Sequence, residues 1–190
     1  MMIRIGIVGD IGSGKTFVAN NFGYPVFNAD YEVSKLYKKN RNIFSKLKRR
    51  LPKYISTFPL KKGELTNAIL SNKKNLKIII NIVHKEVRKK LITFLNKNQN
   101  KKIVILDIPL LIENKIYKKN DVLIFVDSKK KDIDEKIKKR PNYNINLINM
   151  FRKIQLNPIY KKKKSNYIIK NKFKKEPIKK EIKKILADIL

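Results

Sequence analysis

The stretch that most constrains the fold of this 190-residue chain is GDIGSGKT at residues 9–16, directly after the apolar run IRIGIV. Gly9, Gly14, Lys15 and Thr16 satisfy the spacing G-x-x-x-x-G-K-[ST]. The run has the branched apolar residues of a buried strand, and FVANNF after Thr16 is typical of the first turns of a helix. A strand, a glycine-rich loop and a helix in that order predict a P-loop rather than an ordinary glycine turn.

The chemistry of such a loop is specific. Glycines let backbone N–H groups come close to a polyphosphate, and the helix that follows adds the positive end of its dipole. Lys15 can then reach the β- and γ-phosphates, while the Thr16 hydroxyl can ligate Mg²⁺. The motif therefore predicts nucleotide binding.

Composition limits the class of protein. Hydrophobic residues make up 42% of the chain, enough for one core with insertions. No apolar run approaches the length of about 18 residues that a membrane span needs. The first residues enter a strand without the pattern of a signal peptide, and the absence of cysteine excludes disulfides and thiolate metal sites. These features predict a soluble cytoplasmic protein with no membrane partner.

The net charge of +32 has two interpretations. Lysine arrays neutralise phosphates, so a nucleic-acid partner is one of them. However, the lysines are spread along the chain beside abundant Asn and Ile, which AT-rich codons also supply. Base bias explains the composition better than a specific nucleic-acid partner, because net charge reports non-specific association rather than fold.

Alternation of strands and helices predicts an α/β fold with a parallel sheet. Expected strands lie at residues 3–8, 24–28, 102–107, 121–127 and 166–171. Expected helices follow the loop at Thr16 and lie at residues 32–48, 65–72, 76–96, 133–140, 145–156 and 177–190. Lysine runs at residues 129–131 and 161–164 are interpreted as solvated surface or a mobile cover.

Three aspartates stand at or just beyond predicted strand ends, where open α/β sheets place their chemistry. Asp107 closes an IVIL run and resembles a Walker-B acid associated with Mg²⁺, or else it caps a turn. Asp30 could accept the proton of an acceptor hydroxyl, or cap the helix that begins near Glu32. Asp127 precedes Ser128 and a helix start, which favours a capping role.

Taken together, these residues resemble the dephospho-CoA kinase family over nearly the whole chain. The resemblance rests on G-x-I-G-S-G-K at residues 9–15, A-D at 29–30, G-E-L at 63–65, I-V-H at 82–84, V-R at 87–88, P-L-L-I-E at 109–113, the strand at 121–127, Gln155 and I-I-K-N at 168–171. It implies an enzyme that uses ATP and Mg²⁺ to phosphorylate the ribose 3′-hydroxyl of dephospho-CoA.

The resemblance also implies roles for single residues. Catalytic roles fall on Asp30, Lys15 and Arg140, the last in a lid over the phosphates. Nucleotide binding falls on Gly12, Ser13, Gly14, Lys15, Thr16, Phe17 and Asn171. The acceptor substrate is assigned to Asp30, His84, Arg88, Leu110 and Glu113, and the metal to Thr16, Asp30 and Asp107. On chemistry alone a single helical histidine is more often structural, so His84 depends on the resemblance.

The sequence departs from the family pattern at several of these places. Asp10 replaces a glycine of the phosphate loop, Asn28 replaces an aspartate, and Lys136 replaces a lid arginine. Asn67, Lys85 and the pair at 165–166 also differ. Each change affects one contact, whereas the P-loop, Asp30 and P-L-L-x-E remain.

The resulting expectation is a three-layer P-loop NTPase sandwich with a five-stranded parallel sheet. Its core is expected at residues 1–32, 97–134 and 161–190, a helical CoA-binding insertion at 33–96 and a lid at 135–160. A monomer or weak homo-oligomer is expected. Alternative functions are a nucleoside or nucleotide monophosphate kinase, or a nucleic-acid-binding ATPase, which would need stacking aromatics in a basic groove.

Overall fold

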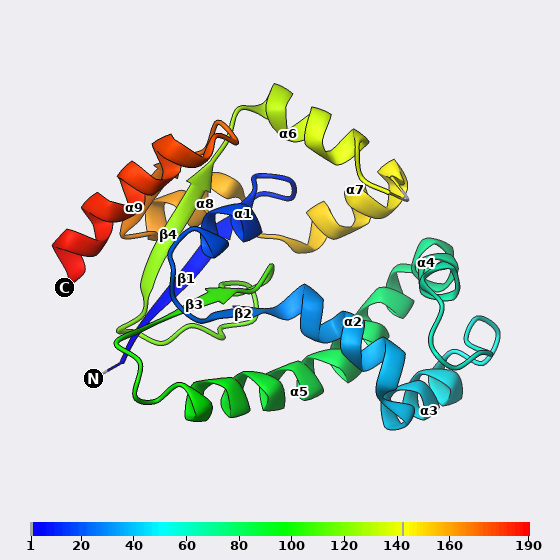
Figure 1. The fold of residues 1–190 in the computed structure, drawn as a ribbon. Coiled ribbons are helices and arrows are strands. Elements are labelled where there is room, and N and C mark those ends of the chain that lie inside the picture. The colour runs from blue at the N-terminus through cyan, green and yellow to red at the C-terminus, as the bar shows by residue number, and fades with distance from the viewer. Residues whose placement is uncertain (1, 142) are drawn as a thin grey trace. The chain divides into compact units, whose positions relative to one another are not determined.

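The computed structural model describes residues 2–141 and 143–190. The chain divides into two compact units (Figure 1). The first comprises Met1–Asn28, Lys97–Tyr143 and Arg152–Leu190, and the second comprises Ala29–Asn96 and Asn144–Phe151. The predicted division into core, insertion and lid is a finer one and stays a prediction; the predicted insertion lies within the second unit.

The first unit is built on one five-stranded sheet in which every neighbouring pair is parallel. The strand order is β2-β3-β1-β4-β5. The strands are β1 (Ile3–Gly9), β2 (Val26–Asn28), β3 (Ile103–Asp107), β4 (Val122–Asp127) and β5 (Tyr167–Lys170). All five predicted strands are confirmed, each within two residues of its expected ends.

Strand register brings the sequence motifs to one edge of the sheet. Ile7 pairs with Asp107, and Asp107 pairs in turn with Asn28. On the other side of β1, Gly9 pairs with Val126. The carboxyl ends of parallel strands lie along the same side of the sheet. The P-loop and the residues that follow β2, β3 and β4 therefore all start at that side.

Apolar side chains bury both faces of this sheet, as expected of central parallel strands. On one face, Ile5 and Ile7 pack with Val18 of α1 (Lys15–Asn20) and Ile182 of α9 (Lys175–Ile189). On the other, Leu111 packs over Gly6 of β1. Helices and sheet form the predicted three-layer α/β arrangement.

The second unit is helical, with α2 (Ala29–Lys39), α3 (Arg41–Arg50), α4 (Lys62–Ser71) and α5 (Lys73–Lys97). The single helix predicted over residues 32–48 is wrong, because Asn40 breaks it. Asn40 has an extended backbone, and its side-chain oxygen accepts a hydrogen bond from Ile43 N at 2.9 Å. Asparagine is a favoured N-cap, so this residue ends α2 and starts α3.

Three further helices are α6 (Lys130–Lys138), α7 (Ile145–Ile154) and α8 (Pro158–Lys164). The first two confirm predicted helices, whereas α8 covers the lysine run that was expected to be solvated surface. Asn157 caps α8 and Pro158 occupies its first turn, a start signal that the lysines obscured. In the described part of the chain, no helix is long and apolar enough to cross a membrane.

Glu64 organises the loop before α4. Its Oε1 accepts hydrogen bonds from the backbone N–H and hydroxyl groups of both Ser56 and Thr57, at 2.6–3.2 Å. Burial alone would raise the pKa of the Glu64 carboxyl, but these four donors hold the pKa below its ordinary value. The ionised carboxylate therefore stabilises this loop.

We predict that Glu64→Gln lowers the melting temperature at about pH 7 and that the difference from wild type disappears toward about pH 3. A carboxyl with a lowered folded-state pKa stabilises the fold above its unfolded pKa and loses that contribution as the pH falls through the folded value. Thermal melts of both proteins across this range test the prediction. Glu86→Gln is the matched control, because it removes the carboxylate that pairs with the exposed side chain of Lys89. A pH-independent difference for Glu64→Gln would contradict it.

Candidate active site

The loop between β1 and α1 has the backbone conformation that the motif predicts. Gly12 and Gly14 have φ values of 84° and 86°, a region that side-chain-bearing residues rarely adopt. A Cβ on Gly12 would lie 2.7 Å from Ile137 of α6, and one on Gly14 would collide with the side-chain amide of Asn171. Both glycines are therefore required by backbone conformation and by close packing.

Lys15 folds back over the mouth of the loop. Its Nζ lies 2.7 Å from the carbonyl oxygen of Asp10 and 3.3 Å from that of Gly9. The Asp10 carboxylate accepts a hydrogen bond from Ile11 N at 2.6 Å. The Asp10 side chain thus bonds to the backbone of its own loop, and the Lys15 ammonium is held by two carbonyl oxygens of the same loop.

The far side of the loop is held through Ser13. Its carbonyl accepts hydrogen bonds from Ser128 Oγ and Asn171 Nδ2, both at 2.8 Å. Ser13 is 1% exposed, and its hydroxyl has no hydrogen-bond partner among the described residues. Asn171 is also buried, and its Oδ1 accepts from Phe173 N at 2.7 Å. The nucleotide residue predicted near the C-terminus is therefore in contact with the P-loop.

Asp107 gathers two partners at the end of β3. Its Oδ2 accepts hydrogen bonds from Thr16 Oγ1 and Asn28 Nδ2, each at 2.6 Å. A threonine hydroxyl beside a buried carboxylate is a hard-oxygen donor pair that fits Mg²⁺, which is commonly held by one or two carboxylates plus substrate phosphates. Two of the three predicted metal residues, Thr16 and Asp107, are thus in direct contact.

A cavity of about 350 Å³ opens beside the loop, at the carboxyl end of β4. Its lining is Asp10, Ser13, Phe125, Val126, Asp127, Ser128, Lys130, Ile133, Arg152 and Pro158. The predicted capping role of Asp127 is wrong: α6 has Lys129 at its N-cap, without a side-chain hydrogen bond. Asp127 instead pairs with Lys162 at 2.7 Å, which holds α8 against the strand end.

Asp30 lies in the second unit, exposed in the first turn of α2. That helix begins at Ala29, so Asp30 is inside the helix rather than at its N-cap, and the capping alternative does not describe it. A carboxylate in a first turn interacts favourably with the helix dipole. Burial, with the charge of Asp30 as the second cause, raises the pKa of Tyr37 to about 12.

His84 and Arg88 lie one turn apart on α5 of the second unit. Burial, and then the nearby guanidinium of Arg88, lower the pKa of the half-buried His84 below its ordinary value. At neutral pH the imidazole is therefore uncharged and the guanidinium carries the charge. This pair can offer one neutral and one cationic hydrogen-bonding group.

The remaining predicted residues belong to the first unit. Phe17 is partly buried against the core cluster, and Leu110 is half-buried after β3. Arg140 is exposed two residues beyond α6. On α6 itself, Lys136 places its ammonium 5.2 Å from the ring centre of Phe173, a cation–π contact beside Gly14.

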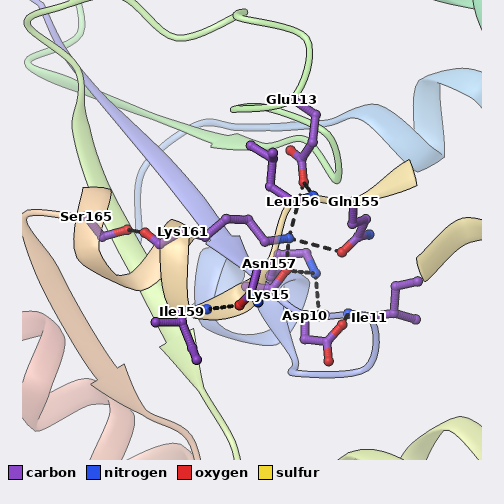
Figure 2. A network of polar contacts seen from close by, with 11 residues as sticks. Asp10, Ile11, Lys15, Glu113, Gln155, Leu156, Asn157, Ile159, Lys161 and Ser165 are labelled. Carbon is purple, nitrogen blue, oxygen red and sulfur yellow. Dashed lines mark hydrogen bonds and ion pairs between the residues drawn. The ribbon is translucent and has the colours of Figure 1, made fainter. Parts of the chain in front are cut away.

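The residue that the sequence analysis missed is Lys161 on α8. It is 1% exposed, and its Nζ contacts Gly9, Glu113 and Gln155 (Figure 2). In the sequence, the four consecutive lysines at residues 161–164 do not indicate that one of them is buried. The helical period offers the only signal, because α8 turns one face of the run toward β1.

Comparison with known proteins decides the family. A model of the family described as dephospho-CoA kinase matches residues 3–176. The chain belongs to the dephospho-CoA kinase family. It is 32% identical to the dephospho-CoA kinase of Wolbachia pipientis wMel and 31% identical to that of the Wolbachia of Brugia malayi, in each case over 97% of both chains. The enzyme of Bartonella quintana is 31% identical over 87% of both chains.

Solved structures agree with the fold. TT1252 from Thermus thermophilus matches with a TM-score of 0.80 and 26% identity, covering 100% of this chain and 98% of the other. Dephospho-CoA kinase from Campylobacter jejuni matches with a TM-score of 0.65 and 21% identity, with the same coverage. Shikimate kinase from Bacteroides thetaiotaomicron has the same fold at a TM-score of 0.53, with 12% identity and 98% and 99% coverage.

We predict that Asn28→Asp lowers the melting temperature at neutral pH without divalent ions, because it places a second carboxylate against Asp107. Mg²⁺ should then raise the melting temperature of the variant more than that of wild type. Thermal melts with and without MgCl₂ measure both effects, and Asn28→Ala is the control that removes the amide without adding charge. Equal responses of Asn28→Asp and Asn28→Ala to Mg²⁺ would contradict this account of Asp107.

Proposed function

We propose that this chain transfers the γ-phosphoryl group of ATP to the ribose 3′-hydroxyl of dephospho-CoA, which gives coenzyme A and ADP. The observation that carries the proposal is the family match over residues 3–176, combined with a formed P-loop whose threonine contacts Asp107. The nearly complete coverage of the curated relatives means that both the loop and the helical unit are included in the match.

The first unit supplies the nucleotide side. Phosphate binding is assigned to the amides of Gly12, Ser13 and Gly14, of which the Ser13 N–H donates to the Asp10 carbonyl at 3.2 Å before a nucleotide binds, and the N-terminus of α1 adds its dipole. Lys15 moves from the carbonyls of the loop to the β- and γ-phosphates. Thr16 and Asp107 would hold Mg²⁺, which supplies neutralisation of the charge that develops on the transferred group.

The second unit supplies the acceptor side. Asp30 follows the end of β2 by two residues, and its exposed carboxylate is the group that takes the proton of the attacking hydroxyl. Neutral His84 and cationic Arg88 on α5 bind polar and anionic groups of the CoA moiety. Two further residues proposed for acceptor binding, Leu110 and Glu113, belong to the first unit, in the loop after β3.

Arg140 acts on the transferring phosphoryl group from the segment after α6. Its forked guanidinium suits charge that spreads over several oxygens in the transition state. Residues 135–160, including α7, form the lid that excludes water while the nucleotide is bound. The enzyme acts in the cytoplasm as a monomer or weak homo-oligomer and has no specific nucleic-acid partner.

We predict that ADP is released with ATP, Mg²⁺ and dephospho-CoA, but not when AMP, adenosine or single-stranded DNA replaces dephospho-CoA. Asp30→Asn should lower kcat by about a hundredfold to ten-thousandfold, because the hydroxyl loses its proton acceptor. Glu32→Gln is the matched control, since it removes a carboxylate from the same helical turn, where Glu32 pairs with Lys35. A coupled ADP assay measures all of these.

Each outcome of that assay separates one alternative. Turnover with AMP would identify a nucleotide kinase, and stimulation by DNA alone would identify a nucleic-acid-dependent ATPase. Full activity of Asp30→Asn with dephospho-CoA would keep the kinase but remove Asp30 from the role of base.

We further predict that Arg140→Ala lowers kcat by about a hundredfold or more while KM for dephospho-CoA changes little, because the guanidinium acts on transition-state charge. Lys139→Ala, the adjacent exposed cation, should be close to wild type. Steady-state kinetics of both variants give the comparison. Equal losses in the two variants would assign Arg140 to general surface charge instead.

A further inference from the structure

Lys161 is the most completely buried charged side chain among the described residues. It is 1% exposed, and its side chain is packed between α8 and the start of the P-loop. Lysine is rarely buried without a partner, because a desolvated ammonium is costly. A lysine in this position needs contacts that compensate its charge.

Three oxygens lie within hydrogen-bonding distance of the ammonium, and Figure 2 shows those of Glu113 and Gln155. Nζ lies 3.0 Å from Gln155 Oε1, 3.3 Å from Glu113 Oε1 and 3.3 Å from the carbonyl oxygen of Gly9. An ammonium has three N–H donors, so each of them has an acceptor. Glu113 is also nearly buried, with a side chain 9% exposed, and the pair is neutral as a whole.

The same cluster fixes the segment between α7 and α8. Glu113 Oε1 accepts a hydrogen bond from Leu156 N at 3.0 Å, next to the Gln155 that contacts Lys161. Ser165 Oγ donates to the Lys161 carbonyl at 2.8 Å and closes the end of α8. The residues before α8 are therefore linked through Glu113 and the Lys161 ammonium to the Gly9 carbonyl at the start of the P-loop.

That carbonyl is shared by two lysines. Gly9 is buried at the end of β1, and its oxygen lies 3.3 Å from the Nζ of both Lys15 and Lys161. The Lys15 ammonium has three N–H donors and gives two of them to the carbonyls of Gly9, at 3.3 Å, and Asp10, at 2.7 Å. Binding both the β- and the γ-phosphate of ATP therefore requires it to release at least one carbonyl, and the longer contact, to Gly9, is the weaker of the two. A buried acceptor left without a donor costs free energy, so the departure of Lys15 would weaken nucleotide binding unless another donor stays.

We propose that Lys161 is a positioning residue that keeps the Gly9 carbonyl partnered when Lys15 moves to the phosphates of ATP. Glu113 and Gln155 hold its ammonium in place for this purpose. The inference rests on the proposed role of Lys15 in nucleotide binding. It assigns a function in nucleotide affinity to a lysine that touches neither substrate.

The test is the binding of Mg²⁺–ATP and of AMP to the full chain, measured by isothermal titration calorimetry. The variant is Lys161→Met with Glu113→Gln, which removes both charges of the pair and leaves no uncompensated ion. We expect about a tenfold loss of affinity for ATP and little change for AMP, because only a ligand with β- and γ-phosphates draws Lys15 away from Gly9. Lys163→Met, an exposed lysine on the same helix, is the matched control and should bind both nucleotides like wild type.

A second arm places the same double substitution in a Lys15→Met background. If Lys161 acts through Lys15, its effect on ATP affinity disappears there, as a double-mutant cycle detects. A purely structural role would lower the melting temperature and change ATP and AMP affinities alike. Unchanged ATP affinity, equal losses for ATP and AMP, or an effect that persists without Lys15 would each overturn the proposal. Unaltered ATP binding by Lys15→Met alone would instead refute the nucleotide role of Lys15.

Discussion

The close approach of neighbouring segments to the loop at residues 9–14 is the constraint on which the rest of the first unit depends. Ile137 of α6 packs on Gly12, and Asn171 packs on Gly14 while donating to the Ser13 carbonyl. Lys161 reaches the Gly9 carbonyl from α8. Segments far apart in sequence therefore meet on a few backbone atoms, and a side chain larger than hydrogen at Gly12 or Gly14 would separate them.

Side-chain hydrogen bonds to the loop are divided between its carbonyl oxygens, and two of these oxygens each accept from two side chains. Lys15 and Lys161 share the Gly9 oxygen, and Ser128 and Asn171 share that of Ser13. This division orients the loop before any nucleotide arrives, which lowers the ordering cost of binding. Asp107 orients Thr16 in a similar way, since its Oδ2 accepts hydrogen bonds from both the threonine hydroxyl and the Asn28 amide.

Local sequence patterns predicted the sheet well, because GDIGSGKT and the apolar runs ending at Asp107 and Asp127 are read from consecutive residues. Long-range contacts were harder to predict. The capping role given to Asp127 failed because its partner, Lys162, is 35 residues away. Lys161 was missed for the same reason: lysine is usually exposed, and only its contacts with residues 9 and 113 make burial possible. Asn28 is the clearest example of such a long-range contact. Its amide donates to Asp107 on β3, and the sequence alone does not show that β3 lies beside β2.

The most direct test of the central claim is the chemical identity of the product. The full chain would be incubated with ATP, Mg²⁺ and dephospho-CoA, and the product would be analysed by mass spectrometry and phosphorus NMR. We expect one added phosphoryl group, carried as a monoester on the ribose 3′-hydroxyl, with one ADP formed for each. A phosphate at another position, or ATP hydrolysis without a phosphorylated acceptor, would contradict the assignment of this site to coenzyme A formation.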